Sequence, residues 1–332
     1  MKKALIAAGG TGGHLLPAQQ LAELLREKQG MEVVFAGYKL DKSPYFRREQ
    51  FVYREVPAER LGSWKFLWKL CVGTVRAIKL LRTEKPDVVV GFGSYHTVPV
   101  LLAATLLRKK IVLFEANTML GKVNRLFRPF ATKIAGQFLP IRDGKDVRVK
   151  CFPWVTKVWN KLEARRELGL ETDKFTVLVF GGSQGAKFLN EMIPLVAERL
   201  PHVQWLHIAG NETAADEIRS RFMGSGKVFA FSNNMPLLYA AADMAVCRSG
   251  AGTVAELMRF GVPAILIPYP HAADNHQWHN AQILVERGVG ICVLQDEATV
   301  DVLVNHLQTW KPLAMRVVDE HNVDIDVLVG EL

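Results

Sequence analysis

The stretch "LIAAGGTGGHLLPAQQLAELL", from Leu5 to Leu25, decides the fold of this chain. A short apolar run leads into Gly-Gly-Thr-Gly-Gly, then a histidine, and then a helical pattern of apolar residues. Because glycines leave the backbone uncovered, the N–H groups at the start of such a helix can approach an anion closely. The stretch therefore predicts a strand, a phosphate-binding turn and a helix.

The same arrangement returns 172 positions later as "TVLVFGGSQGAKFLNEMIPLVAERL", residues 176–200. In both halves, further short apolar runs alternate with helical patterns, which is typical of parallel sheets covered by helices on both faces. We therefore predict an α/β protein with two doubly wound, Rossmann-like domains, residues 1–153 and 154–313. Ligands of such sheets bind at the carboxyl ends of the strands, so we expect the active site in a cleft between the domains. We expect residues 314–332 to form a helix that completes the first domain.

The composition is that of a soluble protein, because 49% of the 332 residues are apolar but no window offers the roughly 18 apolar residues of a membrane span. The four scattered cysteines indicate reduced, cytosolic thiols. The net charge of +9 is uneven: residues 1–160 hold 28 Lys and Arg against 12 Asp and Glu, whereas residues 161–332 hold 14 against 21. A half this basic predicts nucleic acid or an anionic membrane as partner, unless it is only a charged surface.

The first glycine turn is neither a Walker A loop nor a dinucleotide fingerprint. No Lys-Ser/Thr pair follows its glycines, and Leu15 stands where the third glycine of G-x-G-x-x-G would be. The acidic residue that binds a dinucleotide ribose is also missing, because Gly37 and Tyr38 end the second apolar run and Asp41 lies beyond it. A dehydrogenase is therefore a poor interpretation.

Two later turns, "GFGSY" at residues 91–95 and "CRSGAGTVAEL" at residues 247–257, also follow apolar runs and precede helices. In the second turn, Thr253 and Glu256 have the spacing of a capping box, which would be purely structural. Alternatively, the Glu256 carboxylate accepts both hydroxyls of a ribose. The residues alone leave both readings open.

A row of polar residues follows, with His276, Gln277 and Asn280 at helical spacing just after Asp274. Neutral donors and acceptors of this kind suit the hydroxyls of a sugar. An ordinary polar helix face would have the same pattern.

Taken together, "GGTGGH", "GFGSY", "GKVNRLF", "GGSQGA" and "CRSGAGTVAEL…PYPHAADNHQWHNA" closely resemble the MurG family, in order, from about residue 4 to about residue 295. These are membrane-associated N-acetylglucosaminyltransferases of peptidoglycan synthesis, GT-B enzymes of glycosyltransferase family 28. The resemblance implies inverting transfer of N-acetylglucosamine from UDP-N-acetylglucosamine to the muramoyl 4-hydroxyl of lipid I, which gives lipid II. It also implies a bacterial cytoplasmic protein, peripheral on the inner face of the membrane, with other cell-wall synthesis proteins as possible partners.

The resemblance assigns each domain a substrate. UDP-N-acetylglucosamine would bind the second domain, with uracil near Ser232, the ribose on Glu256 and the diphosphate on backbone N–H groups. The donor-binding residues would be Ser183, Gln184, Ser232, Ala251, Gly252, Thr253, Glu256, His276, Gln277 and Asn280. The first domain would receive lipid I. Its acceptor-binding residues would be Gly10, Thr11, Gly12, Gly13, Gly93, Ser94, Tyr95, Asn117 and Asn124.

The resemblance also gives His14 a role as the base that takes the proton from the acceptor hydroxyl. An imidazole with an ordinary pKa of about 6.5 suits this work, and a helix N-terminus favours its neutral form. The alternative is a helix-terminal residue that only bonds the backbone. We expect no cofactor and no metal, because Asp324-Ile325-Asp326 is the one Asp-x-Asp string and lies in the C-terminal helical pattern. The helix dipole and backbone N–H groups would stabilise the departing UDP instead.

The chain departs from the family pattern at two places. Phe114-Glu115-Ala116-Asn117 stands where the family has His-Glu-Gln-Asn, and Phe152-Pro153-Trp154-Val155 where it has Asn-Pro-Val-Arg. Lys157 could replace the arginine only as a point charge. A nucleotide-sugar or lipid-binding homologue with weakened catalysis is therefore one alternative. UDP-N-acetylglucosamine 2-epimerase, which shares the donor and the fold, is another.

The segment "RLGSWKFLWKLCVGTVRAIKLLR", residues 60–82, interleaves aromatic and apolar residues with Lys and Arg. Such a segment suits the interfacial layer of an anionic bilayer, although it could also pack as an ordinary helix on the sheet. The predicted membrane-facing residues are Trp64, Lys65, Phe66, Trp68 and Lys69. No nucleic-acid partner is expected, because no helix-turn-helix, RRM or zinc signature accompanies the charge.

Overall fold

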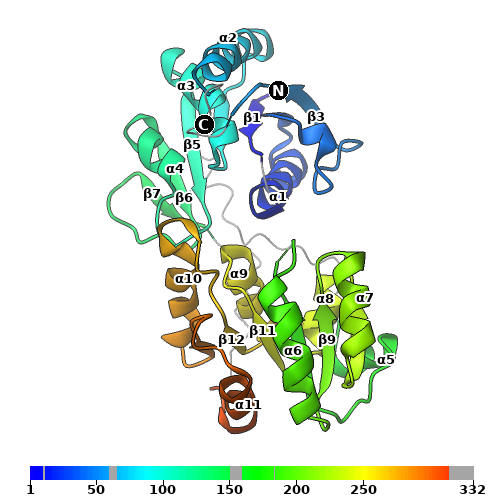
Figure 1. The fold of residues 1–332 in the computed structure, drawn as a ribbon. Helices are drawn as coiled ribbons and strands as arrows, with labels where there is room; N and C mark the ends of the chain where they lie inside the picture. The colour runs from blue at the N-terminus through cyan, green and yellow to red at the C-terminus, as the bar shows by residue number, and fades with distance from the viewer. Residues whose placement is uncertain (10–11, 60–65, 150–158, 183, 314–332) are drawn as a thin grey trace. The chain divides into compact units, whose positions relative to one another are not determined.

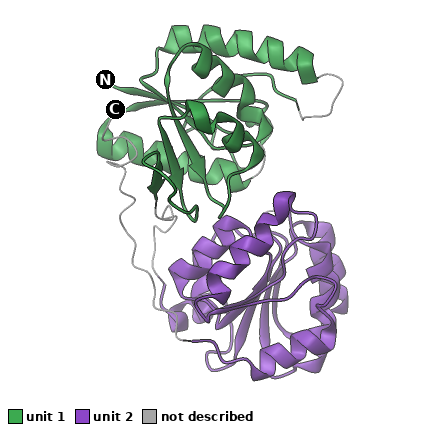
Figure 2. Cartoon of the chain, turned by 90° about the vertical axis from the view of Figure 1, so that its left-hand side faces the viewer, with its two compact units in different colours: residues 1–154, 321–332 green, residues 155–320 purple. Residues whose placement is uncertain are grey.

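The computed structural model describes residues 1–9, 12–59, 66–149, 159–182 and 184–313 (Figure 1). The chain divides into two compact units, the first within residues 1–154 and the second within residues 155–320 (Figure 2). Each unit is built on one parallel sheet with connecting helices. The predicted α/β class, with two parallel-sheet domains, is therefore confirmed. The predicted helix at 314–332 and the junction motif at 152–157 lie outside the described residues.

Seven parallel strands form the sheet of the first unit, in the order β3-β2-β1-β4-β5-β6-β7. The strands are β1 (Lys3–Ala7), β2 (Glu32–Gly37), β3 (Val52–Glu55), β4 (Val88–Gly91), β5 (Lys110–Glu115), β6 (Lys133–Gly136) and β7 (Asp146–Arg148). The described helices are α1 (Gly12–Gln29), η1 (Leu40–Lys42), α2 (Phe66–Glu84), η2 (Tyr95–Thr97), α3 (Val98–Leu106), α4 (Lys122–Phe127) and η3 (Arg128–Phe130). The strand order reverses between β1 and β4, and doubly wound sheets bind ligands at the carboxyl ends beside such a reversal.

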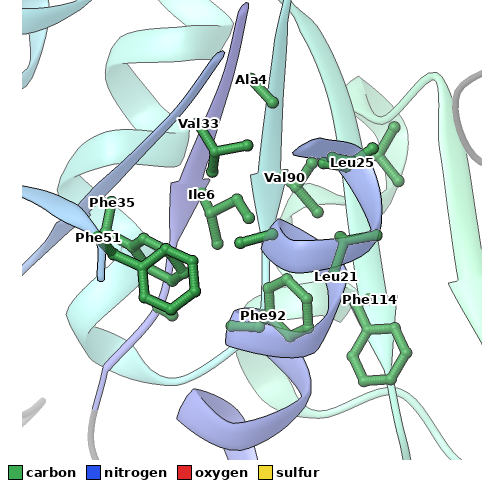
Figure 3. Packing of buried hydrophobic residues seen from close by; sticks show 14 of the residues in the cluster. Ala4, Ile6, Leu21, Leu25, Val33, Phe35, Phe51, Val90, Phe92 and Phe114 are labelled. Atoms are coloured by element: carbon green, nitrogen blue, oxygen red, sulfur yellow. The ribbon is translucent and has the colours of Figure 1, made fainter. Parts of the chain in front are cut away.

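Alternate residues of β1 enter the cores on opposite faces of this sheet. Ile6 packs with Phe35 and with Leu21 of α1 on one face (Figure 3). Leu5 packs on the other face with Leu101 of α3 and with buried residues of α2. Because both faces are covered, the ends of β1 and β4 are held firmly at the edge of the sheet.

Six parallel strands form the second sheet, in the order β10-β9-β8-β11-β12-β13. The strands are β8 (Thr176–Phe180), β9 (Gln204–Ile208), β10 (Ser225–Phe229), β11 (Met244–Cys247), β12 (Ala264–Leu266) and β13 (Gly290–Cys292). The described helices are α5 (Lys161–Glu167), α6 (Lys187–Arg199), α7 (Glu212–Arg221), α8 (Met235–Ala241), α9 (Ala251–Phe260), η4 (Ala273–Asn275), α10 (His276–Val285) and α11 (Val300–Thr309). Here the order reverses between β8 and β11. Within the described chain, no helix combines the length and apolarity needed to cross a bilayer.

Candidate active site

The first unit brings two loops together where β1 and β4 end. A Cβ atom at Gly9 would stand 2.8 Å from the Cβ of His96, so the loop after β4 packs directly on the turn after β1. Gly93 and Ser94 in that loop both have φ of 69°, a conformation that is rare for serine. The ring of Tyr95 lies 4.0 Å from that of His96. These predicted acceptor residues therefore gather with the start of α1, where Gly12 is buried.

His14, in the first turn of α1, has a second imidazole as neighbour. Burial and, to a smaller extent, the charge of His14 lower the pKa of His96 to about 4, against the opposite effect of Glu59. The Ser94 Oγ lies 3.1 Å from His96 Nδ1 and accepts the backbone N–H of His96, so its own proton is free to bond Nδ1. His96 is therefore uncharged at neutral pH. In the sequence, a place just after a glycine–serine turn is the only signal of His96, and no role was predicted for it.

Glu115, at the end of β5, holds two predicted acceptor residues, Asn117 in the following loop and Asn124 in α4. Its buried carboxylate accepts hydrogen bonds from the side-chain amides of Asn117 at 2.8 Å and Asn124 at 3.0 Å. It also accepts the backbone N–H of Gly121 at 2.8 Å. Asn124 donates further to the carbonyl oxygen of Phe114 at 2.8 Å. No role was predicted for Glu115 from the sequence, although its one carboxylate organises both asparagines.

The exposed face of α2 is apolar at its start and basic toward its end. Leu67 and Trp68 are 71% and 73% exposed, and Val75 is 66% exposed. Arg76 and Lys79 follow on the exposed side, while the opposite side packs on the sheet. The core-packing interpretation therefore describes the buried side of α2, whereas membrane contact of its exposed side stays a prediction.

Two of the predicted membrane residues do not share this exposed face. The Nζ of Lys69 lies 2.6 Å from Glu59 Oε2 and 3.5 Å from the hydroxyl of Tyr38, and the bond to Glu59 raises the pKa of Lys69. The Lys69 ammonium is thus paired within the first unit, and the membrane contact predicted for it stays a prediction. Phe66 is partly buried. Trp64 and Lys65 lie outside the described residues, as do Gly10 and Thr11.

In the second unit, the glycines of the turn after β8 have a structural reason. A Cβ at Gly181 would stand 2.2 Å from a backbone nitrogen, and one at Gly185 would stand 2.1 Å from the carbonyl oxygen of Ala209. Gly185 also has φ of 72°. Gln184 is exposed beside them, and Ser183 lies outside the described residues. Close packing of backbone therefore explains Gly181 and Gly185 without a ligand, and Gly182, which meets nothing within 4 Å, has φ of 87°.

The turn after β11 is different, because its helix N-terminus is open. Gly250 is the N-cap of α9, and no side chain caps the helix. A Cβ at Gly252 would meet nothing within 4 Å. The first N–H groups of a helix have no intrahelical partner, so those of Ala251, Gly252 and Thr253 can bind an anion there. Since Thr253 lies inside the helix rather than at its N-cap, the capping-box reading of Thr253 and Glu256 is wrong.

Glu256 lies one turn further along α9, and its Oε2 accepts a hydrogen bond of 2.7 Å from the hydroxyl of Tyr239. Part of the residue remains exposed, but its carboxyl group is desolvated. Burial raises the pKa of Glu256, and the bond from Tyr239 opposes this. Burial and the charge of Glu256 raise the pKa of Cys247 at the end of β11. The carboxylate is thus held at one oxygen, beside the open helix N-terminus.

The polar residues on α10 use some of their side-chain atoms for hydrogen bonds within the protein. Asn280 is fully buried and donates to the carbonyl oxygen of Ser249 at 3.2 Å, which fixes the loop ahead of α9. The Oε1 of Gln277 accepts the backbone N–H of Tyr269 at 2.9 Å. The Nδ1 of His276 lies 2.7 Å from a backbone carbonyl oxygen in the preceding turn. Gln277 and His276 each keep one polar side-chain nitrogen that these bonds do not use.

Two further residues complete this edge of the second sheet. Ser232, after β10, is partly exposed and its Oγ accepts the backbone N–H of Asn234 at 3.2 Å. Arg248 is buried after β11 and donates to the carbonyl oxygens of Ile267 and Pro268 at 3.0 and 3.1 Å, while burial lowers its pKa. Arg248 ties the ends of β11 and β12 together, a role that was not predicted from the sequence. Across the described chain, no three His, Cys, Asp or Glu side chains are placed to hold a metal ion.

Two domain models match the chain: the glycosyltransferase family 28 N-terminal domain on residues 4–136 and the family 28 C-terminal domain on residues 176–316. The chain is 38% identical to the UDP-N-acetylglucosamine–N-acetylmuramyl-(pentapeptide) pyrophosphoryl-undecaprenol N-acetylglucosamine transferase of Protochlamydia amoebophila, covering 92% of this chain and 87% of that protein. It is 36% identical to the protein of the same name in Rickettsia canadensis, covering 92% and 90%.

Solved structures share the fold. The crystal structure of Acinetobacter baumannii MurG has a TM-score of 0.80 and 24% sequence identity, and the match covers 100% of both chains. The calicheamicin glycosyltransferase CalG4 has a TM-score of 0.66 and 14% identity, covering 99% of this chain and 95% of that one. With both domain models and relatives above 30% identity spanning nearly the whole sequence, the chain belongs to glycosyltransferase family 28 and, within it, to the MurG transferases.

Proposed function

We propose that this enzyme transfers N-acetylglucosamine from UDP-N-acetylglucosamine to lipid I and so forms lipid II. The observation that carries the proposal is the 38% identity, over 92% of the chain, to a curated transferase of that name. The geometry is compatible with it, because each unit has a glycine-rich turn where its strand order reverses. The turn of one unit would bind one phosphate-bearing substrate, and the turn of the other unit would bind the second substrate.

The donor would bind the second unit along the carboxyl edge of its sheet. The diphosphate would accept hydrogen bonds from the N–H groups of Ala251, Gly252 and Thr253 at the open end of α9. Glu256 would accept the ribose hydroxyls. His276 and Gln277 would use their remaining side-chain nitrogens on the sugar. Because Asn280 is buried, its part would be to hold the loop before α9.

In the reaction, the muramoyl 4-hydroxyl attacks the anomeric carbon of N-acetylglucosamine from the side opposite UDP, which inverts that carbon. The new carbon–oxygen bond forms as the bond between the anomeric carbon and the β-phosphate oxygen breaks. His14 would take the hydroxyl proton. The dipole and backbone N–H groups of α9 would stabilise the negative charge that develops on UDP.

The acceptor would bind the first unit, with its diphosphate near the loops after β1 and β4. Asn117 and Asn124, held by Glu115, would line this side. The exposed apolar start of α2 would enter the interfacial layer of an anionic membrane, and Arg76 and Lys79 would contact its headgroups. Such docking would hold the enzyme on the inner face of the cytoplasmic membrane, where it could meet other cell-wall synthesis proteins.

Incubation of the full chain with labelled UDP-N-acetylglucosamine and a lipid I analogue tests the proposal. Transfer of label to the acceptor supports it. Release of free N-acetylmannosamine would show a 2-epimerase instead. Binding of UDP-N-acetylglucosamine without turnover would show a nucleotide-sugar-binding homologue that has lost catalysis.

A further inference from the structure

A buried tyrosine outside the assigned donor residues makes the direct contact with Glu256. Tyr239, on α8, is 1% exposed. Its ring stacks on Phe260, with centroids 5.0 Å apart and planes 13° apart, and forms a T-shaped pair with Phe180, with centroids 5.7 Å apart. Two aromatic contacts of different geometry leave the ring little freedom. Its hydroxyl is therefore fixed at 2.7 Å from Glu256 Oε2.

We propose that Tyr239 is the positioning residue of the donor site, which holds the Glu256 carboxylate so that Oε1 is left to accept the ribose hydroxyls of a uridine diphosphate. The inference rests on the proposed function and deepens it. A glutamate side chain on a helix has several rotatable bonds, and fixing it costs conformational entropy. The hydrogen bond from Tyr239 fixes the ionised carboxylate before the ligand binds, so this entropy is not lost on binding. Such charge-assisted bonds are stronger than neutral ones, which makes the bond strong enough to offset the entropy.

The same contact favours the ionised form of the carboxylate. Burial raises the pKa of Glu256, and the Tyr239 hydroxyl lowers it. Cys247, from β11, is the other titratable group that interacts with Glu256 in the described chain, and it is neutral at pH 7 because its pKa is raised. Without the Tyr239 hydroxyl, the effect of burial is no longer opposed, and the pKa of Glu256 should rise. The carboxylate would then take up a proton at a higher pH and lose acceptor capacity toward ribose.

This arrangement also gives a basis for sugar specificity. Because Oε2 is taken by Tyr239, the 2′- and 3′-hydroxyls of a ribose meet a carboxylate with mainly one oxygen available. A 2′-deoxyribose would leave that oxygen less well paired, and unpaired buried acceptors are costly. The site should therefore prefer UDP over 2′-deoxy-UDP, and this preference should depend on Tyr239.

The Tyr239→Phe variant of the full chain tests the inference, since it removes one oxygen and keeps the stacked ring. We expect UDP to bind about tenfold more weakly at pH 7 by calorimetry. The KM for UDP-N-acetylglucosamine should rise by a similar factor, and kcat should stay within about twofold of its value in the original chain. The acid-side midpoint of kcat/KM for the donor should move to higher pH, and the preference over 2′-deoxy-UDP should shrink. Tyr53→Phe, which removes a buried hydroxyl in the first unit, is the matched control and should change none of these.

A second variant keeps the test independent of a folding defect. In a Glu256→Gln background, Tyr239→Phe should add no further loss of UDP affinity, whereas a structural defect would add its loss in both backgrounds. Unchanged UDP affinity and an unchanged midpoint in Tyr239→Phe would overturn the inference. If the original chain binds UDP but transfers no sugar to lipid I, the proposed function fails while the binding comparison still decides the role of Tyr239. A chain that binds no UDP overturns both.

Discussion

His14 and His96 place two imidazoles beside the same glycine turn, but their surroundings give them different uses. The pKa of His96 is lowered to about 4, so it is a weak base with a fixed neutral charge at pH 7. Its Nδ1 faces the Ser94 hydroxyl, and its Cβ packs against Gly9. His96 is therefore suited to hold the loops together, and His14 remains the candidate base.

Replacement of His14 by alanine should reduce transfer about 10²- to 10⁴-fold, because a positioned general base contributes that much. Affinity for UDP should not change, since the proposed donor site is in the second unit. Turnover and calorimetry on the same preparation measure both quantities. His202→Ala, an exposed histidine in the second unit, is the control. Full turnover by His14→Ala would remove His14 from catalysis.

A third histidine, His207 on β9, should make the protein sensitive to acid. It is fully buried with Nε2 3.0 Å from Asn190 Oδ1, and burial lowers its pKa to about 4. An unfolded histidine has a pKa of about 6.5. As the pH falls from 6.5 to 4, His207 therefore binds a proton in the unfolded state but stays neutral in the folded state. The free energy of unfolding falls over this pH range.

Between pH 7 and pH 5, His207 should account for about 2 kcal/mol of lost stability. Urea unfolding at the two pH values measures it, and in His207→Gln this part of the pH dependence should be absent. The same pH dependence in both proteins would mean that other groups cause it.

At the scale of elements, each open loop depends on one buried side chain. Glu115 gathers the loop after β5, and Asn280 fixes the loop before α9. The contrast between the glycines of the second unit is also informative. Gly185 is required by a close backbone contact, whereas Gly252 faces open space. Gly182 in the turn after β8 also meets nothing within 4 Å, but its φ of 87° favours glycine. Gly252 has neither a close contact nor a positive φ to explain it.

The Glu115→Gln change should loosen the loop after β5 and the side chains of Asn117 and Asn124, because an amide cannot accept as many hydrogen bonds as a carboxylate. The KM for the lipid I analogue should rise about tenfold, since bonds to a charged acceptor are among the stronger ones. Affinity for UDP should stay the same. Kinetics with each substrate varied in turn separate the two effects. An equal loss toward both substrates would contradict a role confined to the acceptor loop.

On α2, replacing Leu67 and Trp68 together by glutamate should reduce binding to anionic vesicles at least tenfold, because each exposed apolar side chain contributes when it enters the interface. Sedimentation with vesicles measures binding, and higher salt should weaken the remaining interaction of Arg76 and Lys79. Leu195→Glu, an exposed leucine on α6, is the control. A loss of the same size in that control would contradict docking through α2.

A strong hydrophobic pattern made most helices and strands predictable from the sequence. The elements that could not be predicted lack such a pattern. The buried strands β1, β2, β4, β5 and β8 are near-continuous apolar runs, and the sequence shows each of them. In contrast, β3 is an edge strand with residues Val-Tyr-Arg-Glu, mostly exposed, and β7 has three residues. Neither carries a readable pattern. His96, Glu115 and Arg248 were missed because their roles come from contacts between loops that no local spacing reveals.

At the scale of the whole molecule, charge and phosphate chemistry are distributed unevenly. Residues 1–160 carry the excess of Lys and Arg, whereas residues 161–332 are acidic overall. A doubly charged diphosphate bound to the acidic half must therefore rely on local N–H groups and the helix dipole rather than on net charge. The basic half instead fits a membrane surface and a lipid-linked diphosphate. One donor-binding unit and one acceptor-binding unit account for both facts.

A crystal structure of the full chain with UDP-N-acetylglucosamine tests this division most directly. The account predicts the diphosphate against the N–H groups of Ala251, Gly252 and Thr253, with a ribose hydroxyl within hydrogen-bond distance of Glu256. A diphosphate found instead at the glycine turn ahead of α1 would contradict it.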